Sequence, residues 1–204
     1  MVRLTLLSLL LPLSFVYPPI EARFQGMTNL ASASWDGECF YPVRDTRFSL
    51  SKYRGKWYYL AGTETPFKSA GCICNVHATH SAIGDGEIRI DGECDAGDKH
   101  SNKTFDAIAK PDLDHGNVGA YRVDYPEEKN SSCPGPNYVV VDLRDDMAIM
   151  ASSNFSSVFV LTREPQPAKY LRESWMRRGE VVAGGNKVKL HMLDQSSCKN
   201  NKDE

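Results

Sequence analysis

The stretch that decides the fold is Gly55-Lys56-Trp57-Tyr58-Tyr59-Leu60-Ala61-Gly62-Thr63. It is rich in aromatic side chains, which favour β-structure. With the two-residue period of a strand, it predicts one face with Trp57, Tyr59 and Ala61 and another with Tyr58 and Leu60. Gly55 allows the chain to turn sharply before the strand begins. We therefore predict a β-strand over 55–63.

Seven further segments have the same character, short β-branched and aromatic runs separated by Gly, Asn, Asp and Pro. They are residues 72–80, 87–94, 103–110, 118–125, 138–143, 147–152 and 157–163. Gly84-Asp85-Gly86 supplies the positive-φ positions that a hairpin turn needs. Eight strands joined in order by short turns can close around one small ligand. We predict an all-β protein, an eight-stranded antiparallel up-and-down barrel.

A helix and a short ninth strand are expected after the barrel. Pro165 and Pro167 open the helix and Gly179 ends it. Its inner stripe is predicted to be Tyr170, Leu171, Ser174 and Trp175. The ninth strand covers 187–192, where Val188, Leu190 and Met192 alternate with polar residues.

The N-terminus reads as a signal peptide over residues 1–22. Arg3 precedes an almost continuous apolar run, Leu4 to Val16, and Ala22 is a small residue suited to cleavage; a second suitable position follows Ala33. The run is shorter than the ~20 residues of a membrane-spanning helix. We expect a secreted, extracellular protein with a flexible leader over 23–38 and one domain over 39–204. Contact with a membrane surface and the oligomeric state stay open.

Two other features are typical of export. Asn102, Asn130 and Asn154 each begin an N-glycosylation sequon. The six cysteines are Cys39, Cys72, Cys74, Cys94, Cys133 and Cys198. In an oxidising compartment they predict up to three disulfides.

The charge balance argues against nucleic acid as a partner. The formal net charge is −2, whereas a protein that neutralises many phosphates needs a basic surplus. Arg172, Arg177 and Arg178 are interpreted as a solvated helix face.

Three blocks of sequence resemble the lipocalin family. Residues 48–58, Phe48-Ser49-Leu50-Ser51-Lys52-Tyr53-Arg54-Gly55-Lys56-Trp57-Tyr58, resemble its opening Gly-x-Trp motif. Residues 138–146 resemble its second block, and Leu161-Thr162-Arg163-Glu164-Pro165 resembles its third. The tail 194–198 is similar to the branch of apolipoprotein D and the bacterial lipocalins. Two departures are Asp145-Asp146-Met147, where a tyrosine is usual, and the extra cysteine at the Cys72/Cys74 pair.

The resemblance implies specific structural roles. Trp57 would plug the closed end of the barrel and Arg163 would lie across its indole, a contact worth ~0.5–2 kcal/mol. It also implies a Cys39–Cys133 disulfide and a bond from Cys72 or Cys74 to Cys198, with the other of the two bonded to Cys94. Because Cys74 and Cys94 lie nearly symmetrically about the hairpin turn, they could face each other. The choice between Cys72 and Cys74 stays open.

Catalytic and metal chemistry are weakly supported. Cys72-x-Cys74-x-x-His77-x-x-His80 offers zinc-ligand types, but the two histidines are three residues apart and would point to opposite faces of a strand. Asp142, Asp145 and Asp146 are interpreted as solvated turn acids. No Gly-x-Ser-x-Gly elbow occurs. We predict no catalytic residue, no metal and no cofactor.

The predicted function is that of a carrier for a small hydrophobic ligand. The resemblance implies a lipid, fatty acid, retinoid, steroid or tetrapyrrole held in the barrel. The predicted lining residues are Tyr59, His77, Ile88, Ile90, Phe105, Tyr138, Val140, Met150 and Phe159, with His77 as the polar contact. Two alternatives are a lipocalin-type enzyme that isomerises a bound lipid and a module that binds or inhibits another protein through the loop 127–136.

Overall fold

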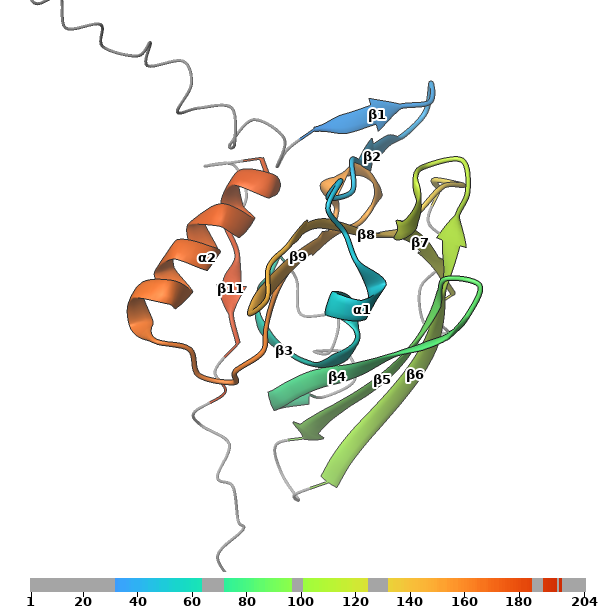
Figure 1. The fold of residues 1–204 in the computed structure, drawn as a ribbon. Helices are drawn as coiled ribbons and strands as arrows, with labels where there is room; N and C mark the ends of the chain where they lie inside the picture. Colours follow the sequence, from blue (N-terminus) through green and yellow to red (C-terminus); the bar gives the residue numbers. More distant parts are fainter. Residues whose placement is uncertain are drawn as a thin grey trace, which may run out of the picture.

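Eight antiparallel strands follow one another around a closed ring in the computed structural model (Figure 1). They are β3 (Gly55–Gly62), β4 (Cys72–Gly84), β5 (Glu87–Ala96), β6 (Ser101–Asp112), β7 (Asn117–Val123), β8 (Tyr138–Leu143), β9 (Met147–Ala151) and β10 (Val158–Thr162). The ring closes because β10 pairs with both β9 and β3. The predicted barrel is confirmed. The structure describes residues 32–63, 72–96, 101–124, 132–184, 189–193 and 195.

Alternate connections of such a meander lie at opposite ends of the barrel. The short helix α1 (Leu50–Tyr53) leads into β3 at one end, which also holds the β4–β5 turn. That turn has the expected left-handed backbone, with φ of +125° at Gly84, +47° at Asp85 and +80° at Gly86. Residues 64–71, 97–100 and 125–131 lie outside the described residues.

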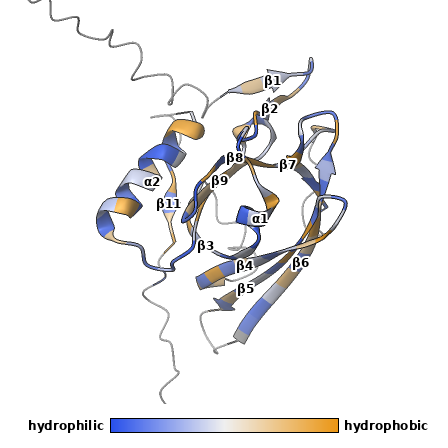
Figure 2. Cartoon of the chain, in the orientation of Figure 1, coloured by the Kyte–Doolittle hydropathy of each residue, from blue (hydrophilic) through white to orange (hydrophobic). Residues whose placement is uncertain are grey.

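Two apolar clusters lie on the two sides of the barrel wall. The interior cluster is formed by inward side chains of the strands, with Tyr53 and Trp57 at its base. The outer cluster joins the wall of β8, β9 and β10 to the helix α2 (Lys169–Val182). Figure 2 shows both hydrophobic and hydrophilic bands along β6 and along α2. The inner face of the barrel wall therefore forms the interior cluster, and part of its outer face packs against α2.

The inward and outward alternation of side chains along β3 is interrupted near the end of the strand. The predicted face of Ala61 is therefore wrong. Leu161 pairs with Tyr59 but Val160 pairs with Ala61, so Leu60 is an extra residue in the ladder. Such a bulge moves the following residue to the other face of the sheet. Ala61 consequently belongs to the outer cluster and not to the side of Trp57 and Tyr59.

The helix α2 is present, but its predicted inner stripe and its end are partly wrong. Trp175 and Val182 are buried, whereas Tyr170 is 71% exposed and Ser174 is also exposed. Gly179 does not end the helix. It lies where the helix approaches the barrel most closely, and a Cβ there would be 2.5 Å from Leu190 and 2.6 Å from Val160.

Asp142 and Arg178, both interpreted from the sequence as solvated, lie instead between α2 and the barrel. Asp142 is 2% exposed. It forms ion pairs with Arg178 of α2 and with Arg144 at 3.2 Å. Asp145, in contrast, is an exposed turn acid that contacts Lys52 at 3.0 Å. The difference arises because Asp142 is still within β8, opposite Ile149 of the outer cluster.

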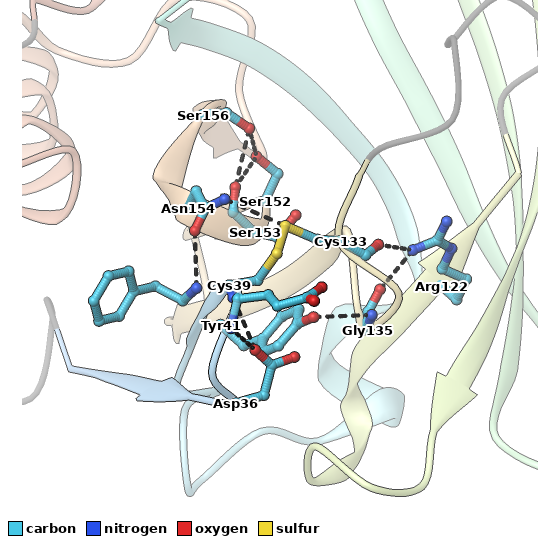
Figure 3. The surroundings of a disulfide bond; sticks show 12 residues. Asp36, Cys39, Tyr41, Arg122, Cys133, Gly135, Ser152, Ser153, Asn154 and Ser156 are labelled. Atoms are coloured by element: carbon cyan, nitrogen blue, oxygen red, sulfur yellow. Dashed lines mark hydrogen bonds between the residues drawn. A yellow bond between two sulfur atoms is a disulfide. The ribbon is translucent and has the colours of Figure 1, made fainter.

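The end of the predicted flexible leader is structured. Strands β1 (Ala33–Trp35) and β2 (Phe40–Pro42) pair as a hairpin, and the disulfide Cys39–Cys133 fastens it to the β7–β8 connection (Figure 3). Asn154, in the short helix η2 (Ser153–Phe155), accepts a hydrogen bond from the Phe40 backbone N–H at 2.8 Å. Residues 1–22, the predicted signal peptide, and 23–31 lie outside the described residues.

The ninth strand is shorter than predicted. Strand β11 (His191–Met192) pairs with Ala61 and Gly62 of β3, and Figure 1 shows it beside α2. Leu190 is buried in the outer cluster before the strand begins. Residues 185–188, which include Val188, lie outside the described residues.

Candidate ligand-binding site

The base of the barrel is sealed by an arginine over a tryptophan. The guanidinium carbon of Arg163 lies 3.5 Å from the centre of the Trp57 ring. Trp57 is fully buried, and its indole N–H donates to the Tyr53 carbonyl at 2.6 Å. A cation over an aromatic face is favourable, more so when it is partly desolvated.

Arg163 also joins the beginning and the end of the barrel. Its guanidinium donates to the carbonyls of Lys56 at 2.7 Å, Lys52 at 2.6 Å and Arg54 at 3.0 Å. Gly55 lies within this contact, with φ of +98° and its Cβ position only 3.3 Å from the guanidinium. The backbone conformation and the close approach both favour glycine there.

Eight of the nine predicted lining residues come together inside the barrel. Seven are buried in the interior cluster: Tyr59, Ile88, Ile90, Tyr138, Val140, Met150 and Phe159. Phe105 packs against that cluster and is half-buried. The inner wall is therefore predominantly apolar.

His77 is the exception, and its predicted place inside the barrel is wrong. Its neighbours Val76 and Ala78 belong to the interior cluster, so the alternation of β4 directs His77 outward. There it lies 3.4 Å from the exposed Glu93, and its ring is tilted against that of Tyr58 with ring centres 5.6 Å apart.

His80 is the histidine that faces inward. It is 1% exposed, and neither of its ring nitrogens has a hydrogen-bond partner within the part of the chain that the structure describes. Its ring lies 4.8 Å from that of Tyr53. Burial, with a smaller contribution from the charge of Arg163, lowers the pKa of His80 to about 3, so the ring is neutral at pH 7. Counting in steps of two from Val76 would have identified it.

Three tyrosines, Tyr53, Tyr121 and Tyr138, complete the polar groups near the base. The hydroxyls of Tyr53 and Tyr138 are 2.5 Å apart. Burial raises the pKa of Tyr53 and of Tyr121, the latter to about 12. These groups are uncharged at neutral pH, so the base of the interior carries dipoles and no formal charge beside the stacked arginine.

Small residues occupy several inward positions of the barrel wall. Gly92 is paired directly with Phe105, whose ring occupies the position of the missing side chain, 1.8 Å from where a Cβ would be. Four further inward positions in the interior cluster are alanines, Ala78, Ala107, Ala109 and Ala148. Although Phe105 faces inward, it is only half-buried.

The cysteines resolve one open alternative. Cys72, not Cys74, is bonded to Cys94. Symmetry about the turn favours Cys74, but the ladder is irregular between Cys72 and His77, which places Cys74 opposite Asp95. Cys74 is also disulfide-bonded; Cys198 lies outside the described residues.

These bonds also bear on the metal hypothesis. Because Cys72 and Cys74 are both in disulfides, neither offers a thiolate, and His77 and His80 occupy opposite faces of β4. Among the described residues, no group of three or more metal-ligating side chains converges.

The three sequons differ in their surroundings. Asn102 is exposed on β6, and Asn130 lies outside the described residues. Asn154 uses its side chain internally: besides the bond to Phe40, its amide nitrogen lies 3.2 Å from the sulfur of Cys133 (Figure 3).

Comparison with known proteins gives a consistent result. A family model described as a lipocalin-like domain matches residues 48–186. No curated protein sequence matches the chain. In the described part of the chain, no helix is long and apolar enough to cross a membrane.

Solved structures with the same fold include three of low sequence identity. Lipocalin 12 from rat epididymis has a TM-score of 0.55 at 16% identity, over 78% of this chain and 92% of that one. The allergen Per a 4 from cockroaches has a TM-score of 0.50 at 17% identity, over 77% and 90%. The siderocalin Ex-FABP has a TM-score of 0.50 at 17% identity, over 72% of this chain and 97% of that one.

Proposed function

Because this chain belongs to the lipocalin-like domain family, we propose that it is a secreted carrier that holds a small hydrophobic molecule inside its barrel. The observation that carries the proposal is an apolar inner wall above a base sealed by Trp57 and Arg163. Lipocalin folds generally bind such ligands. An apolar ligand that leaves water for this wall would gain about 25 cal/mol per Å² of buried apolar area.

The chemistry of the inner wall supports a mainly apolar ligand. Apart from His80 and the tyrosines, the interior cluster is composed of aliphatic, aromatic and cysteine side chains. A ligand that fits is therefore mainly hydrocarbon, such as a lipid, fatty acid, retinoid or steroid. A tetrapyrrole shares this apolar character and belongs among the candidates.

The proposal includes secretion of the protein and its assignment to one branch of the lipocalin family. The disulfides Cys39–Cys133 and Cys72–Cys94 suit an oxidising compartment, as does the apolar N-terminal run. The Cys39–Cys133 bond and the tail 194–198 support assignment to the branch of apolipoprotein D and the bacterial lipocalins. A thiol-dependent lipid isomerase is disfavoured, because Cys39, Cys72, Cys74, Cys94 and Cys133 are all in disulfides.

The test begins with the secreted full-length chain. Organic extracts are analysed by mass spectrometry for co-purifying molecules, and the protein is titrated with oleic acid, retinol, progesterone and haem while tryptophan fluorescence is followed. We expect saturable binding of at least one. A protein that carries nothing and binds none of the four contradicts the proposal.

A matched pair of variants locates the site. Ala107 faces the interior and Ile108, the next residue on β6, is 45% exposed. Ala107→Trp fills the barrel and is expected to weaken binding at least tenfold, whereas Ile108→Trp leaves it unchanged. Circular dichroism verifies that both variants are folded. Equal effects of the two substitutions would place the ligand outside the barrel.

A further inference from the structure

The wall of the barrel is not continuous between β3 and β4. Over the described parts of the two strands, they pair along four rungs, from Gly55 opposite His80 to Tyr58 opposite His77. Beyond that point β3 changes partner, and Ala61 and Gly62 pair with β11. The C-terminal segment therefore completes the wall where β3 and β4 separate.

Gln195 lies at the fork between the two strands. The next rung would join Tyr59 to Val76, and the Gln195 amide nitrogen donates to both of these carbonyls, at 3.2 Å each. Gln195 is only 7% exposed, and among the described residues its side-chain oxygen has no hydrogen-bond partner. A side chain thus substitutes for a missing backbone rung.

Leu193 passes from the outside of the wall to its inside. Its backbone N–H donates to the Leu60 carbonyl at 2.9 Å, and its side chain packs against the interior cluster. Leu190, three residues earlier, packs instead in the outer cluster beneath α2. One short segment therefore contacts both apolar clusters.

An external groove of about 270 Å³ lies directly over Leu193 and Gln195. Its apolar lining includes Leu60, Met192 and Leu193, and its polar lining includes Gln195 and Arg172. Within the described residues, Arg172 forms no ion pair. Leu60, Leu193 and Gln195 lie both on this groove and beside the opening between β3 and β4.

We infer that the ligand enters and leaves the barrel sideways, between β3 and β4, when Leu193 and Gln195 move aside, and that Arg172 attracts a negatively charged head group there. The ligand class is a single-chain amphiphile with a terminal carboxylate. This inference rests on the proposed carrier function and specifies its route and its ligand.

The contacts that hold the segment are suited to such movement. The paired part of β11 is two residues long, and the Gln195 hydrogen bonds are long for N–H to oxygen contacts. Local opening of a short segment breaks only the contacts of that segment, so it costs less free energy than global unfolding.

The first experiment tests the barrier formed by Leu193 and uses stopped-flow fluorescence. Dansyl-labelled undecanoic acid is mixed with wild type, Leu193→Ala and the matched control Leu171→Ala, a half-buried leucine of α2 that packs against the outer cluster. Leu193→Ala is expected to raise the association and dissociation rates at least fivefold while Kd changes less than threefold, because the barrier falls and the bound state persists. Leu171→Ala is expected to leave both rates within twofold.

The second experiment tests the charge and uses surface substitutions that leave the core intact. Arg172→Gln is expected to slow association of the acid at least threefold and reduce its salt dependence, because steering by one charge is lost. It leaves association of dansyl-labelled undecanol unchanged. Arg177→Gln, an exposed neighbour on α2, is the control and alters neither probe.

The outcomes separate this inference from the carrier function. Wild-type binding with rates that Leu193→Ala does not change overturns the lateral route and leaves the carrier function standing. Binding of the alcohol or another uncharged ligand without the acid overturns the role of Arg172. Failure of every ligand to bind the wild-type protein overturns the carrier function and this inference with it.

Discussion

Arg178 of α2 forms an ion pair with Asp142 of β8, and Asp142 is 2% exposed. The pair joins the helix to the outer wall of the barrel through a carboxylate that has little contact with water. Arg144 provides a second cation for Asp142 at 3.2 Å. Burial of a charge is tolerated only when partners of this kind compensate it.

Removal of one partner is expected to destabilise the fold. Arg178→Ala should lower the free energy of unfolding by about 3 kcal/mol, the lower end for a broken buried pair, because Arg144 remains. Arg177→Ala, on an exposed position, should change it by less than about 0.5 kcal/mol. Urea denaturation measures both. Arg178→Ala with wild-type stability would mean that the carboxylate does not depend on the helix.

His80 predicts a loss of stability in acid. Its pKa is about 3 in the folded protein and about 6.5 in the unfolded chain. The unfolded state therefore binds more protons between these values, and stability falls as pH falls below about 6.5. From pH 6.5 to 4.5 the loss is about 2 kcal/mol from this group alone.

The comparison that isolates His80 uses two variants. His80→Phe removes the titrating group and should flatten the pH dependence of stability in this window, whereas His191→Gln, on an exposed strand, should not. Denaturation curves at pH 6.5, 5.5 and 4.5 give the slopes. Identical slopes for His80→Phe and wild type would assign the acid sensitivity elsewhere.

Gly92 and Phe105 are expected to be coupled. A Cβ at residue 92 would overlap the Phe105 ring, so Gly92→Ala should cost about 1–3 kcal/mol through overpacking. Phe105→Leu should relieve most of that cost in the double variant. A double-mutant cycle measured by thermal denaturation gives the coupling energy. Additive effects would show that the ring does not lie over Gly92.

The disulfide Cys39–Cys133 is expected to stabilise the protein by closing a long loop. Its sequence separation is 94, and removal by Cys39→Ala with Cys133→Ala should cost about 2–4 kcal/mol. The β1–β2 hairpin should then become cleavable within residues 33–42 in limited proteolysis. A double variant as protease-resistant as wild type would mean that the Asn154 contact alone holds the hairpin.

The barrel could be predicted because its determinants are local. The two-residue period of segments such as 87–94 and the positive-φ turn at Gly84-Asp85-Gly86 fix strands and hairpins without reference to distant residues. The apolar inward positions of the candidate site follow from the same period. Alternation shows which residues of a strand share a face, but it does not show which face points inward. His77 is therefore assigned correctly to a strand but to the wrong face of it.

What could not be predicted depends on contacts between distant segments. Asp142 is buried because α2 covers it, and nothing near residue 142 in the sequence announces the helix. Gly179 resembles a helix end, but its role is to let α2 approach Val160 and Leu190. The bulge at Leu60 is likewise set by its partner strand, since register is a property of two strands together.

The hydrogen bonds from Arg163 to Lys56 and to Arg54 join residues that are 107 and 109 positions apart. During synthesis, the edge of β3 that pairs with β10 therefore stays open until β10 has emerged. Contacts of such high sequence separation make folding slow, and open strand edges invite association between chains. Because β10 covers the edges of both β3 and β9, truncation after residue 157 would leave an aggregating chain and not a smaller barrel.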